Sequence, residues 1–197
     1  MEINAGMVKQ LREKTGVGMM KCKQALQDAK GDIDEAEKLL RKAGEASAAK
    51  KAGRATGEGL VTSYIHTGGK IGVLLEVNCE TDFAARGEEF QELVRGVAMH
   101  VAAAAPRFVS REDVPAELIA AEREIAAGQA AQSGKPANVI EKIVDGKLDK
   151  FFAEQCLLEQ PYVKDSDRTV GQLVSDAVGK IGENIQVRRF ARFVLGD

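Results

Sequence analysis

The chain has 197 residues, of which 44% are hydrophobic and 29% charged, and its formal net charge is −2. This composition is that of a globular protein, and it excludes a disordered chain and a strongly cationic nucleic-acid binder. The three cysteines are odd in number and far apart, which fits a reducing compartment better than a disulfide framework or a metal site. The polar N-terminus and the lack of a long apolar run predict a cytoplasmic protein without a secretory signal or a membrane span.

Residues 1–52 are predicted to form a domain of three short helices. Their apolar residues recur at helical spacing, at Ile3, Met7, Val8 and Leu11, then Met19, Cys22, Ala25, Leu26 and Ala29, then Ile33, Ala36, Leu39 and Leu40. Thr15–Gly18 breaks the first two helices apart, and Asp32 followed by Glu35 is close to a capping box that starts the third. The stretch 46–59 is small, basic and rich in glycine, so we expect a helix tail that runs into a linker. With 12 Lys or Arg against 8 Asp or Glu, residues 1–54 form a basic head on an acidic body.

Residues 53–197 are predicted to form an α+β core. In chain order the expected elements are strands at 60–66 and 70–78, a helix through 90–101, helices at 115–134 and 136–153, a helix at 169–180 and a strand at 184–195. Gly134-Lys135-Pro136 indicates a helical hairpin. In the last strand, alternation predicts two faces, one with Ile185, Val187 and Arg189 and the other with Gln186, Arg188 and Phe190. The fold class is therefore α+β, with a small antiparallel sheet, flanking helices and a helical hairpin.

The sequence holds little that indicates an enzyme. The two histidines, His66 and His100, lie in different predicted elements without a serine or cysteine at triad-like spacing. No phosphate-binding loop of the GxxxxGK[ST] kind occurs, and the glycines of Thr15–Gly18 join two helices where a dinucleotide site would join a strand to a helix. No spacing of Cys, His and Asp indicates a metal. We therefore expect a protein that is not an enzyme and holds neither a metal nor a cofactor.

One polar segment lies between the second strand and the long amphipathic helix. Thr81 is a good N-cap residue, and an acid such as Asp82 suits the first turn of a helix. Phe83 lies seven residues before Phe90, in phase with the apolar stripe of that helix. Periodicity alone therefore favours a place for Phe83 in the core.

The same segment resembles a known family. Residues 78–86 read NCETDFAAR, which is similar to the N-C-[EQ]-T-D-F-V-A-[RK] signature of the translation elongation factor Ts family, with Ala84 where valine is usual. Further blocks resemble the family in the same order: LREKTGVGMMKCKQAL (11–26), AMHVAA (98–103), SGKP (133–136), EQPYVKD (159–165) and IGENIQVRRF (181–190). The resemblance covers essentially the whole chain, and the length matches the short form of the family, which has a single core unit.

The resemblance implies a function. Members of this family are guanine-nucleotide exchange factors, which bind elongation factor Tu with GDP and promote GDP release by disturbing its Mg²⁺ and phosphate site during translation elongation. The residues that would contact the partner at that site are Thr81, Asp82, Phe83 and Ala84. By the same likeness Phe83 is a partner contact, which reverses the interpretation from periodicity.

The resemblance also implies contacts from other parts of the chain. Residues 1–52 are similar to a ubiquitin-associated-type domain, and Arg12, Met19 and Met20 would lie at its contact with elongation factor Tu. From the residues alone, Arg12 is a solvated charge and the methionines are core filling, although neighbours about 100° apart on a helix rarely both face the core. His100 would touch the partner, or, on a helix, make a local hydrogen bond.

Short members of the family are expected to pair, so the resemblance implies a homodimer, with the core, residues 53–197, as the dimerisation domain. Candidate self-association surfaces are the helical projection at 115–153 and the last strand. Some short members carry a cysteine in that strand where this chain has Ala191, so no disulfide between copies is expected. Neither a direct nucleic-acid partner nor a membrane is expected.

Three other functions remain open from the residues alone. A nucleic-acid binder could use the basic head and Lys50, Lys51 and Arg54, but residues 1–54 contain no aromatic side chain on which a base could stack. The head alone would also permit a ubiquitin-type adaptor. An uncharacterised enzyme would show turnover without a protein partner.

Overall fold

The structure is a computed structural model that describes residues 3–132 and 135–196. It confirms the α+β fold class with a small antiparallel sheet. The chain divides into two compact units, and the first consists of Met1–Val61, Glu76–Arg95 and Gln172–Val187. The second unit consists of Thr62–Leu75, Gly96–Gly171 and Arg188–Asp197. The boundary at residues 52 and 53 that composition indicates stays a prediction.

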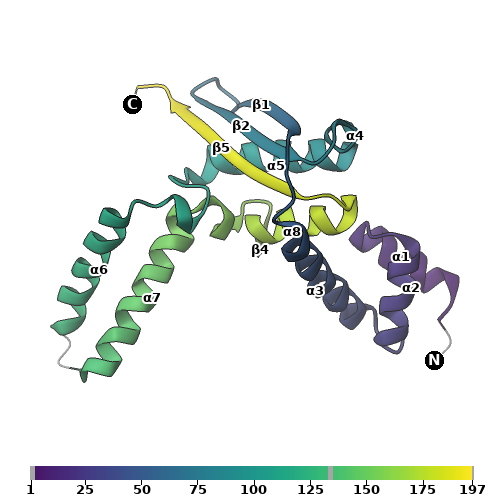
Figure 1. The fold of residues 1–197 in the computed structure, drawn as a ribbon, viewed down its shortest axis with the longest axis horizontal. Coiled ribbons are helices and arrows are strands. Elements are labelled where there is room, and N and C mark those ends of the chain that lie inside the picture. The colour runs from purple at the N-terminus through teal and green to yellow at the C-terminus, as the bar shows by residue number, and fades with distance from the viewer. Residues whose placement is uncertain (1–2, 133–134, 197) are drawn as a thin grey trace. The chain divides into compact units, whose positions relative to one another are not determined.

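The first unit contains three helices near the N-terminus, α1 (Ala5–Thr15), α2 (Met19–Asp28) and α3 (Ile33–Lys51), which we call the head helices (Figure 1). Polar side chains cap two of them, because Asn4 accepts a hydrogen bond from the Met7 N–H and Asp32 accepts one from the Glu35 N–H, both at 2.9 Å. The buried residues that form their small core are Val8, Leu11, Cys22, Ala25, Leu26 and Ala36. The apolar pattern thus predicted this core, with one error: Met19 is exposed.

Helix α3 packs against α8 (Val170–Ile181) within the first unit. Gly44 and Gly179 allow the close approach, since a Cβ added at Gly179 would lie 3.1 Å from the Gly44 Cα atom. The Lys21 ammonium of α2 also donates a hydrogen bond of 3.2 Å to the Gly179 carbonyl. The head helices are therefore attached to α8 by backbone contacts as well as by side chains.

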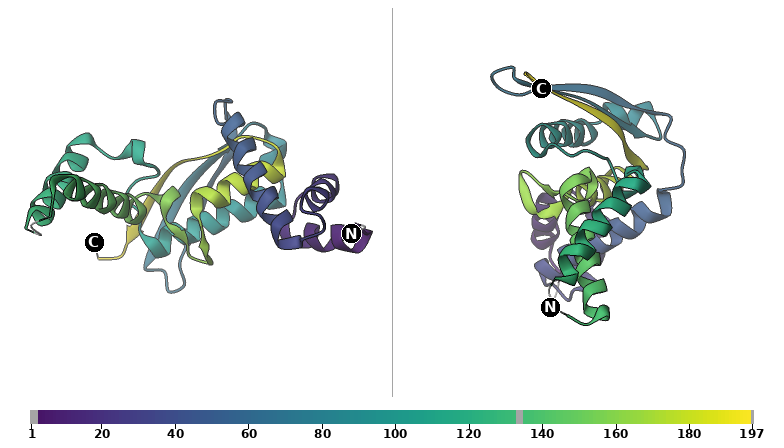
Figure 2. Two further views of the ribbon diagram at one scale, coloured as in Figure 1. Left: turned by 90° about the horizontal axis from the view of Figure 1, so that it is seen from below. Right: turned by 90° about the vertical axis from the view of Figure 1, so that its left-hand side faces the viewer.

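The three-stranded sheet has the order β1-β2-β5, with β1 at Glu58–Ile65, β2 at Ile71–Cys79 and β5 at Ile185–Val194. The side chains of β2 alternate, and those on its buried face are Val73, Leu75, Val77 and Cys79. Helix α5 (Glu88–Ala104) lies along that face of the sheet (Figures 1 and 2). Among the described residues, no helix is drawn over the opposite face in Figures 1 and 2.

The last strand departs from the predicted alternation. Ile185 and Val187 are buried as expected, but Arg189 is exposed and Phe190 is half-buried. The alternation of burial shifts by one after Arg188, so that Phe190 takes the more buried position. The prediction that Arg189 shares a face with Ile185 and Val187 was therefore wrong.

The second unit contains the predicted helical hairpin, formed by α6 (Ala116–Ala131) and α7 (Ala137–Gln155). Its buried core residues are Val114, Ala126, Ala130, Val144, Leu148, Phe152 and Cys156. The predicted turn falls partly outside the described residues, because Ser133 and Gly134 lie there, but Pro136 precedes α7 as its N-cap residue. The short elements around the hairpin are η1 (Arg111–Asp113), η2 (Leu157–Glu159), β3 (Pro161–Tyr162) and β4 (Asp165–Thr169).

The cysteines Cys22, Cys79 and Cys156 are all buried and carry free thiols. Across residues 3–132 and 135–196 no group of three His, Cys, Asp or Glu residues is placed to hold a metal ion. Within the same ranges the helices are too short or too polar to cross a membrane.

Candidate functional site

The polar segment after β2 forms a tight corner (residues 80–83) that leads into the five-residue helix α4 (Asp82–Arg86). Thr81 has an extended backbone, and its hydroxyl oxygen accepts a hydrogen bond of 3.2 Å from the Ala84 N–H. The predicted N-cap is therefore confirmed, as is the place of Asp82 in the first turn. Gly87 ends the helix with φ −65° and ψ 141°, and α5 begins at Glu88.

Phe83 lies at the outer side of this corner, and 85% of its side chain is exposed. Phe90, seven residues later, is fully buried. The prediction from periodicity that both residues belong to one apolar stripe was wrong, because Gly87 leaves the helical conformation and separates α4 from α5. An exposed aromatic side chain on a short helix is available for contact with another molecule.

The two faces of α4 differ. Ala84 and Ala85 are buried, which fixes the helix on the body of the first unit. Asp82 and Arg86 form an exposed ion pair at 2.8 Å, one helical turn apart. Of the four residues that the resemblance assigns to the partner, the structure presents Asp82 and Phe83 outward with Thr81 at the edge, whereas Ala84 faces inward.

The carboxylate of Glu183 holds the corner from the side of the α8–β5 loop. It accepts hydrogen bonds from the N–H groups of Glu80 and Thr81 at 3.1 and 3.0 Å and from the Thr81 hydroxyl at 2.7 Å. Beneath it the Cys79 thiol donates to the Thr81 carbonyl, and burial, with the charge of Glu183, raises the pKa of that thiol. Sequence reasoning missed Glu183, because it lies 102 residues after Thr81 and no local pattern joins the two.

The predicted residues of the head lie around the loop between α1 and α2. Arg12 is in the last turn of α1, and Met19 and Met20 are the first residues of α2. The two methionines are 57% and 77% exposed, so the interpretation as core filling was wrong for both. Gly16 gives the loop its sharp turn with a left-handed φ of 69°, and its N–H donates to the Arg12 carbonyl.

His100 lies in the second unit and is only 1% exposed. Its Nδ1 atom accepts a hydrogen bond of 3.1 Å from the Val163 N–H, so its Nε2–H donates to the Gln160 side-chain oxygen at 2.9 Å. Burial lowers the pKa of the imidazole, against the effect of Gln160. The hydrogen bonds join α5 to a segment 60 residues away, and they leave the ring no free nitrogen; its contact with a partner stays a prediction.

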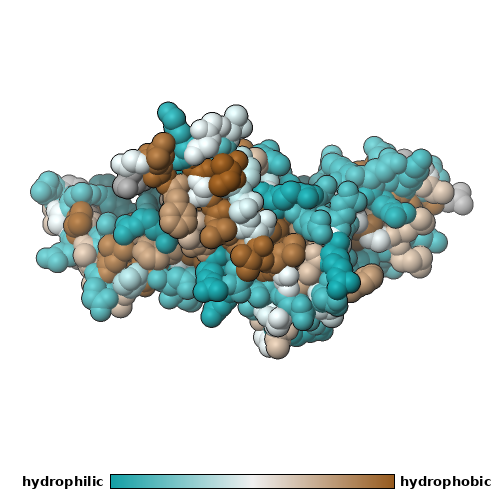
Figure 3. Space-filling view, turned by 90° about the horizontal axis from the view of Figure 1, so that it is seen from above, coloured by the Kyte–Doolittle hydropathy of each residue, from teal (hydrophilic) through white to brown (hydrophobic). Residues whose placement is uncertain are grey.

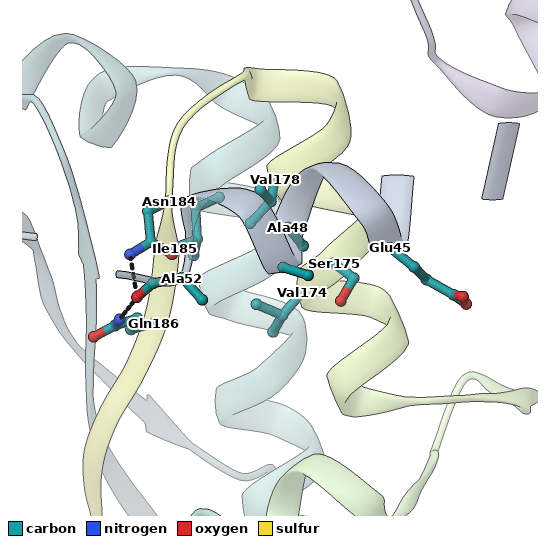
Figure 4. A pocket seen from close by; sticks show the side chains of 10 residues that line it. Glu45, Ala48, Ala52, Val174, Ser175, Val178, Asn184, Ile185 and Gln186 are labelled. Carbon is teal, nitrogen blue, oxygen red and sulfur yellow. Dashed lines mark hydrogen bonds between the residues drawn. The ribbon is translucent and has the colours of Figure 1, made fainter. Parts of the chain in front are cut away.

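A shallow pocket of about 350 Å³ lies in the first unit between α3, α8 and β5 (Figure 4). Its lining is mostly small and apolar, with Ala48, Ala52, Val174 and Val178 beside Asn184. Its one ionisable side chain, Glu45, points away from the amide groups of Asn184 and Gln186 in this view. The pocket therefore lacks the convergent polar groups of a catalytic site.

Comparisons with known proteins agree with the signature residues. A family model described as Elongation factor TS matches residues 8–197. The chain is 61% identical over 196 residues to elongation factor Ts of Anaeromyxobacter dehalogenans, a match that covers 100% of this chain and 90% of that relative. It is 57% identical over 197 residues to elongation factor Ts of Fervidobacterium nodosum, with 100% of both chains covered. Identity to elongation factor Ts of Geobacter sulfurreducens is also 57% over 197 residues, which is 100% of this chain and 91% of that relative.

Proposed function

The chain belongs to the elongation factor Ts family and is a translation elongation factor, and on that premise we propose that it is a guanine-nucleotide exchange factor for elongation factor Tu. It acts in the cytoplasm on the GDP-bound form, promotes GDP release and also binds the nucleotide-free form. The observation that carries the proposal is Phe83, an aromatic side chain 85% exposed at a corner that hydrogen bonds hold in place. The chain does this by binding and not as an enzyme with its own reaction chemistry.

The proposed mechanism is an insertion. Phe83 and Asp82 enter the GTPase beside its switch region and displace the elements that hold Mg²⁺ and the phosphates. Because the ion neutralises the charge of the diphosphate, weaker coordination weakens the binding of GDP. The coupling is reciprocal. If the chain lowers the affinity of the GTPase for GDP by some factor, GDP lowers the affinity of the GTPase for the chain by the same factor.

The energy for this insertion comes from more than one residue. Loosening GDP by about 10⁴-fold requires about 5.5 kcal/mol of differential binding. One interface residue contributes about 2–4 kcal/mol when it is a hot spot, so Phe83 alone is insufficient. Arg12, Met19 and Met20 on the head helices are exposed and supply the additional contact area in this proposal. The head helices bind the GTPase, and the corner converts that binding into nucleotide release.

The direct test is the release of labelled GDP from elongation factor Tu, with and without the chain. We expect the chain to accelerate release. We expect excess Mg²⁺ to reduce the acceleration, because a higher concentration of the ion favours its binding at the weakened site in the GTPase. A release rate that does not change with chain concentration would contradict the proposal.

We also propose that two copies of the chain associate through the uncovered face of the sheet. Exposed apolar side chains on or directly after the strands in the second unit include Ile65, Leu74, Phe193 and Leu195. Figure 3 looks onto this side of the molecule and shows hydrophobic residues gathered in the middle of the face. Exposed apolar side chains gathered on one face favour an interface.

Sedimentation equilibrium tests the pairing. Leu74→Lys places a charge on the patch and is expected to shift the mass from dimer to monomer with an unchanged circular dichroism spectrum. Ile125→Lys is the matched control, since Ile125 is exposed on α6 and away from the sheet. Loss of the dimer in the control but not in Leu74→Lys would assign the interface to the helical hairpin instead.

A further inference from the structure

Hydrogen bonds join the corner to the end of the head helices through the loop between α8 and β5. We propose that Glu183 is a positioning residue for the Asp82–Phe83 corner, and that Asn184 ties the same loop to the end of α3, so that docking of the head is passed to the corner. This inference rests on the proposed exchange function. Every residue of the junction lies in the first unit.

Glu183 satisfies three donors of the corner with a single side chain. One carboxylate oxygen accepts from the backbone N–H groups of Glu80 and Thr81, and the other accepts from the Thr81 hydroxyl. Hydrogen bonds to an ionised acceptor are about twice as strong as neutral ones. The backbone that carries Asp82 and Phe83 is therefore held by a charged group from a distant part of the chain.

The three hydrogen bonds to the Glu183 carboxylate, which we call the clamp, also fix the cap of helix α4. A hydroxyl has one proton, and in Thr81 that proton points to Glu183, which leaves the oxygen lone pairs to accept from the Ala84 N–H. Helix α4 has five residues, too few to be stable by itself, because nucleation of a helix is costly. Its existence, and with it the direction of Phe83, thus depends on this cap and on the clamp that orients it.

Glu80 makes the reciprocal contact. Its carboxylate accepts a hydrogen bond of 2.6 Å from the Asn184 N–H, and it lies 3.4 Å from the Arg54 guanidinium. Each of the two acids therefore binds the backbone of the segment that carries the other. Such a crossed pair resists a shear of the corner against the loop, since movement in either direction stretches hydrogen bonds to a charged acceptor.

Asn184 extends the junction to the end of α3. It is 3% exposed, and its side-chain amide donates to the carbonyls of Ala52 at 3.3 Å and Arg54 at 2.8 Å. The Gln186 amide donates to the same Ala52 carbonyl at 3.2 Å, and both amides converge there in Figure 4. Ala52 is the C-cap residue of α3, so these amides satisfy a backbone acceptor that the helix leaves unpaired.

The contacts form a continuous path. It begins at the C-terminal end of α3, passes through the Asn184 amide to the Glu183–Asn184 backbone, and reaches the corner through the Glu183 carboxylate. In this arrangement the head and the corner move as one body when the head docks. Without these hydrogen bonds Phe83 would still be exposed, but the backbone of the corner would move when Phe83 contacts the GTPase.

The test separates binding from release in the full-length chain. For Glu183→Ala we expect the rate constant of GDP release at saturating chain to fall about tenfold or more, while the dissociation constant for elongation factor Tu changes less than about threefold. Glu183→Gln should recover most of the rate, because an amide can still accept from the backbone and bond the Thr81 hydroxyl. Asn184→Ala should lower the rate in the same way, and Asp167→Ala, an exposed acid on β4, is the control.

Amide hydrogen exchange of the free chain gives a second readout that needs no partner. Glu183→Ala should speed exchange at the N–H groups of Glu80 and Thr81 by a larger factor than in the head helices, because only the corner loses its hydrogen-bond acceptor. If the wild-type chain accelerates GDP release and Glu183→Ala does so at the same rate, the positioning role of Glu183 is overturned while the exchange function stands. No acceleration by the wild-type chain would overturn the exchange function. A wild-type rate in Asn184→Ala would overturn the tie to α3.

Discussion

Phe83 and Phe90 have the same side chain and the same helical phase but opposite environments. The sequence shows the spacing of the two residues, yet exposure is decided by Gly87 between them, whose backbone leaves the helix. Sequence patterns gave no means to decide between a glycine inside a helix and a glycine that ends one. The cap at Thr81 was predictable, since it depends on residues three apart, and the structure confirms it.

The two phenylalanines predict a contrast in stability. Phe83→Ala removes an exposed ring and should change the free energy of unfolding by less than about 1 kcal/mol. Phe90→Ala leaves a cavity beneath the sheet and should lower that free energy by about 3–5 kcal/mol. Urea unfolding of the two variants measures both values. Equal losses would return Phe83 to the core and remove the basis for its proposed role.

His100 predicts a dependence of stability on pH. Burial lowers its pKa in the folded chain, so the unfolded chain takes up the proton first as the pH falls below about 6.5. Stability is then fully present above that pH and declines below it, by at most about 1.4 kcal/mol per pH unit for one group.

The measurement is urea unfolding of the wild type and of His100→Gln between pH 7.5 and 5.5. The variant keeps hydrogen-bonding capacity but does not titrate, so its stability should fall less steeply than that of the wild type. Parallel curves for the two proteins would show that the pH dependence arises elsewhere.

Each helix and strand that was predicted lies close to its predicted position, whereas the short strands β3 and β4 were not predicted. The strand predicted at 184–195 is β5 at Ile185–Val194, and the helix predicted at 169–180 is α8 at Val170–Ile181. These predictions succeeded because apolar periods and cap residues are local signals. The predicted faces of β5 were partly wrong, because the spacing of apolar residues does not show where along the strand the alternation shifts.

The contact of α3 with α8 predicts a difference between two glycines. Gly146→Ala in α7, where a Cβ meets nothing within 4 Å, should stabilise the chain by about 0.5–1 kcal/mol through helix propensity. Gly179→Ala gains the same propensity but places its Cβ 3.1 Å from the Gly44 Cα atom. It should therefore be less stable than Gly146→Ala by about 1–2 kcal/mol. Thermal unfolding compares them, and equal effects would mean that α3 does not press on α8.

At the scale of the whole molecule, local signals were insufficient. Glu80 and Asn184 are 104 residues apart, and no pattern in either segment indicates that one binds the other. The resemblance to a family placed both segments among its shared blocks without stating how they meet. The corner was therefore predicted as a site from the family, and the support beneath it came only from the structure.

Variants of the exposed methionines of the head test whether the head helices supply binding while the corner acts on nucleotide release. The double variant Met19→Ala, Met20→Ala removes apolar contact area from a surface and should leave the melting temperature near that of the wild type. It should weaken binding to elongation factor Tu by about tenfold or more, while the release rate at saturating chain stays close to the wild-type rate. Titration of GDP release against chain concentration separates the two effects. A lower rate at saturation with unchanged affinity would assign these residues to the insertion step.

The role of Phe83 is tested by single-turnover release of labelled GDP from elongation factor Tu at saturating Phe83→Ala. We expect this variant still to bind the GTPase, because the head helices are intact, but to release GDP at least about tenfold more slowly than the wild type. A Phe83→Ala chain that binds and releases GDP at the wild-type rate would contradict the claim that the exposed phenylalanine acts on the nucleotide site.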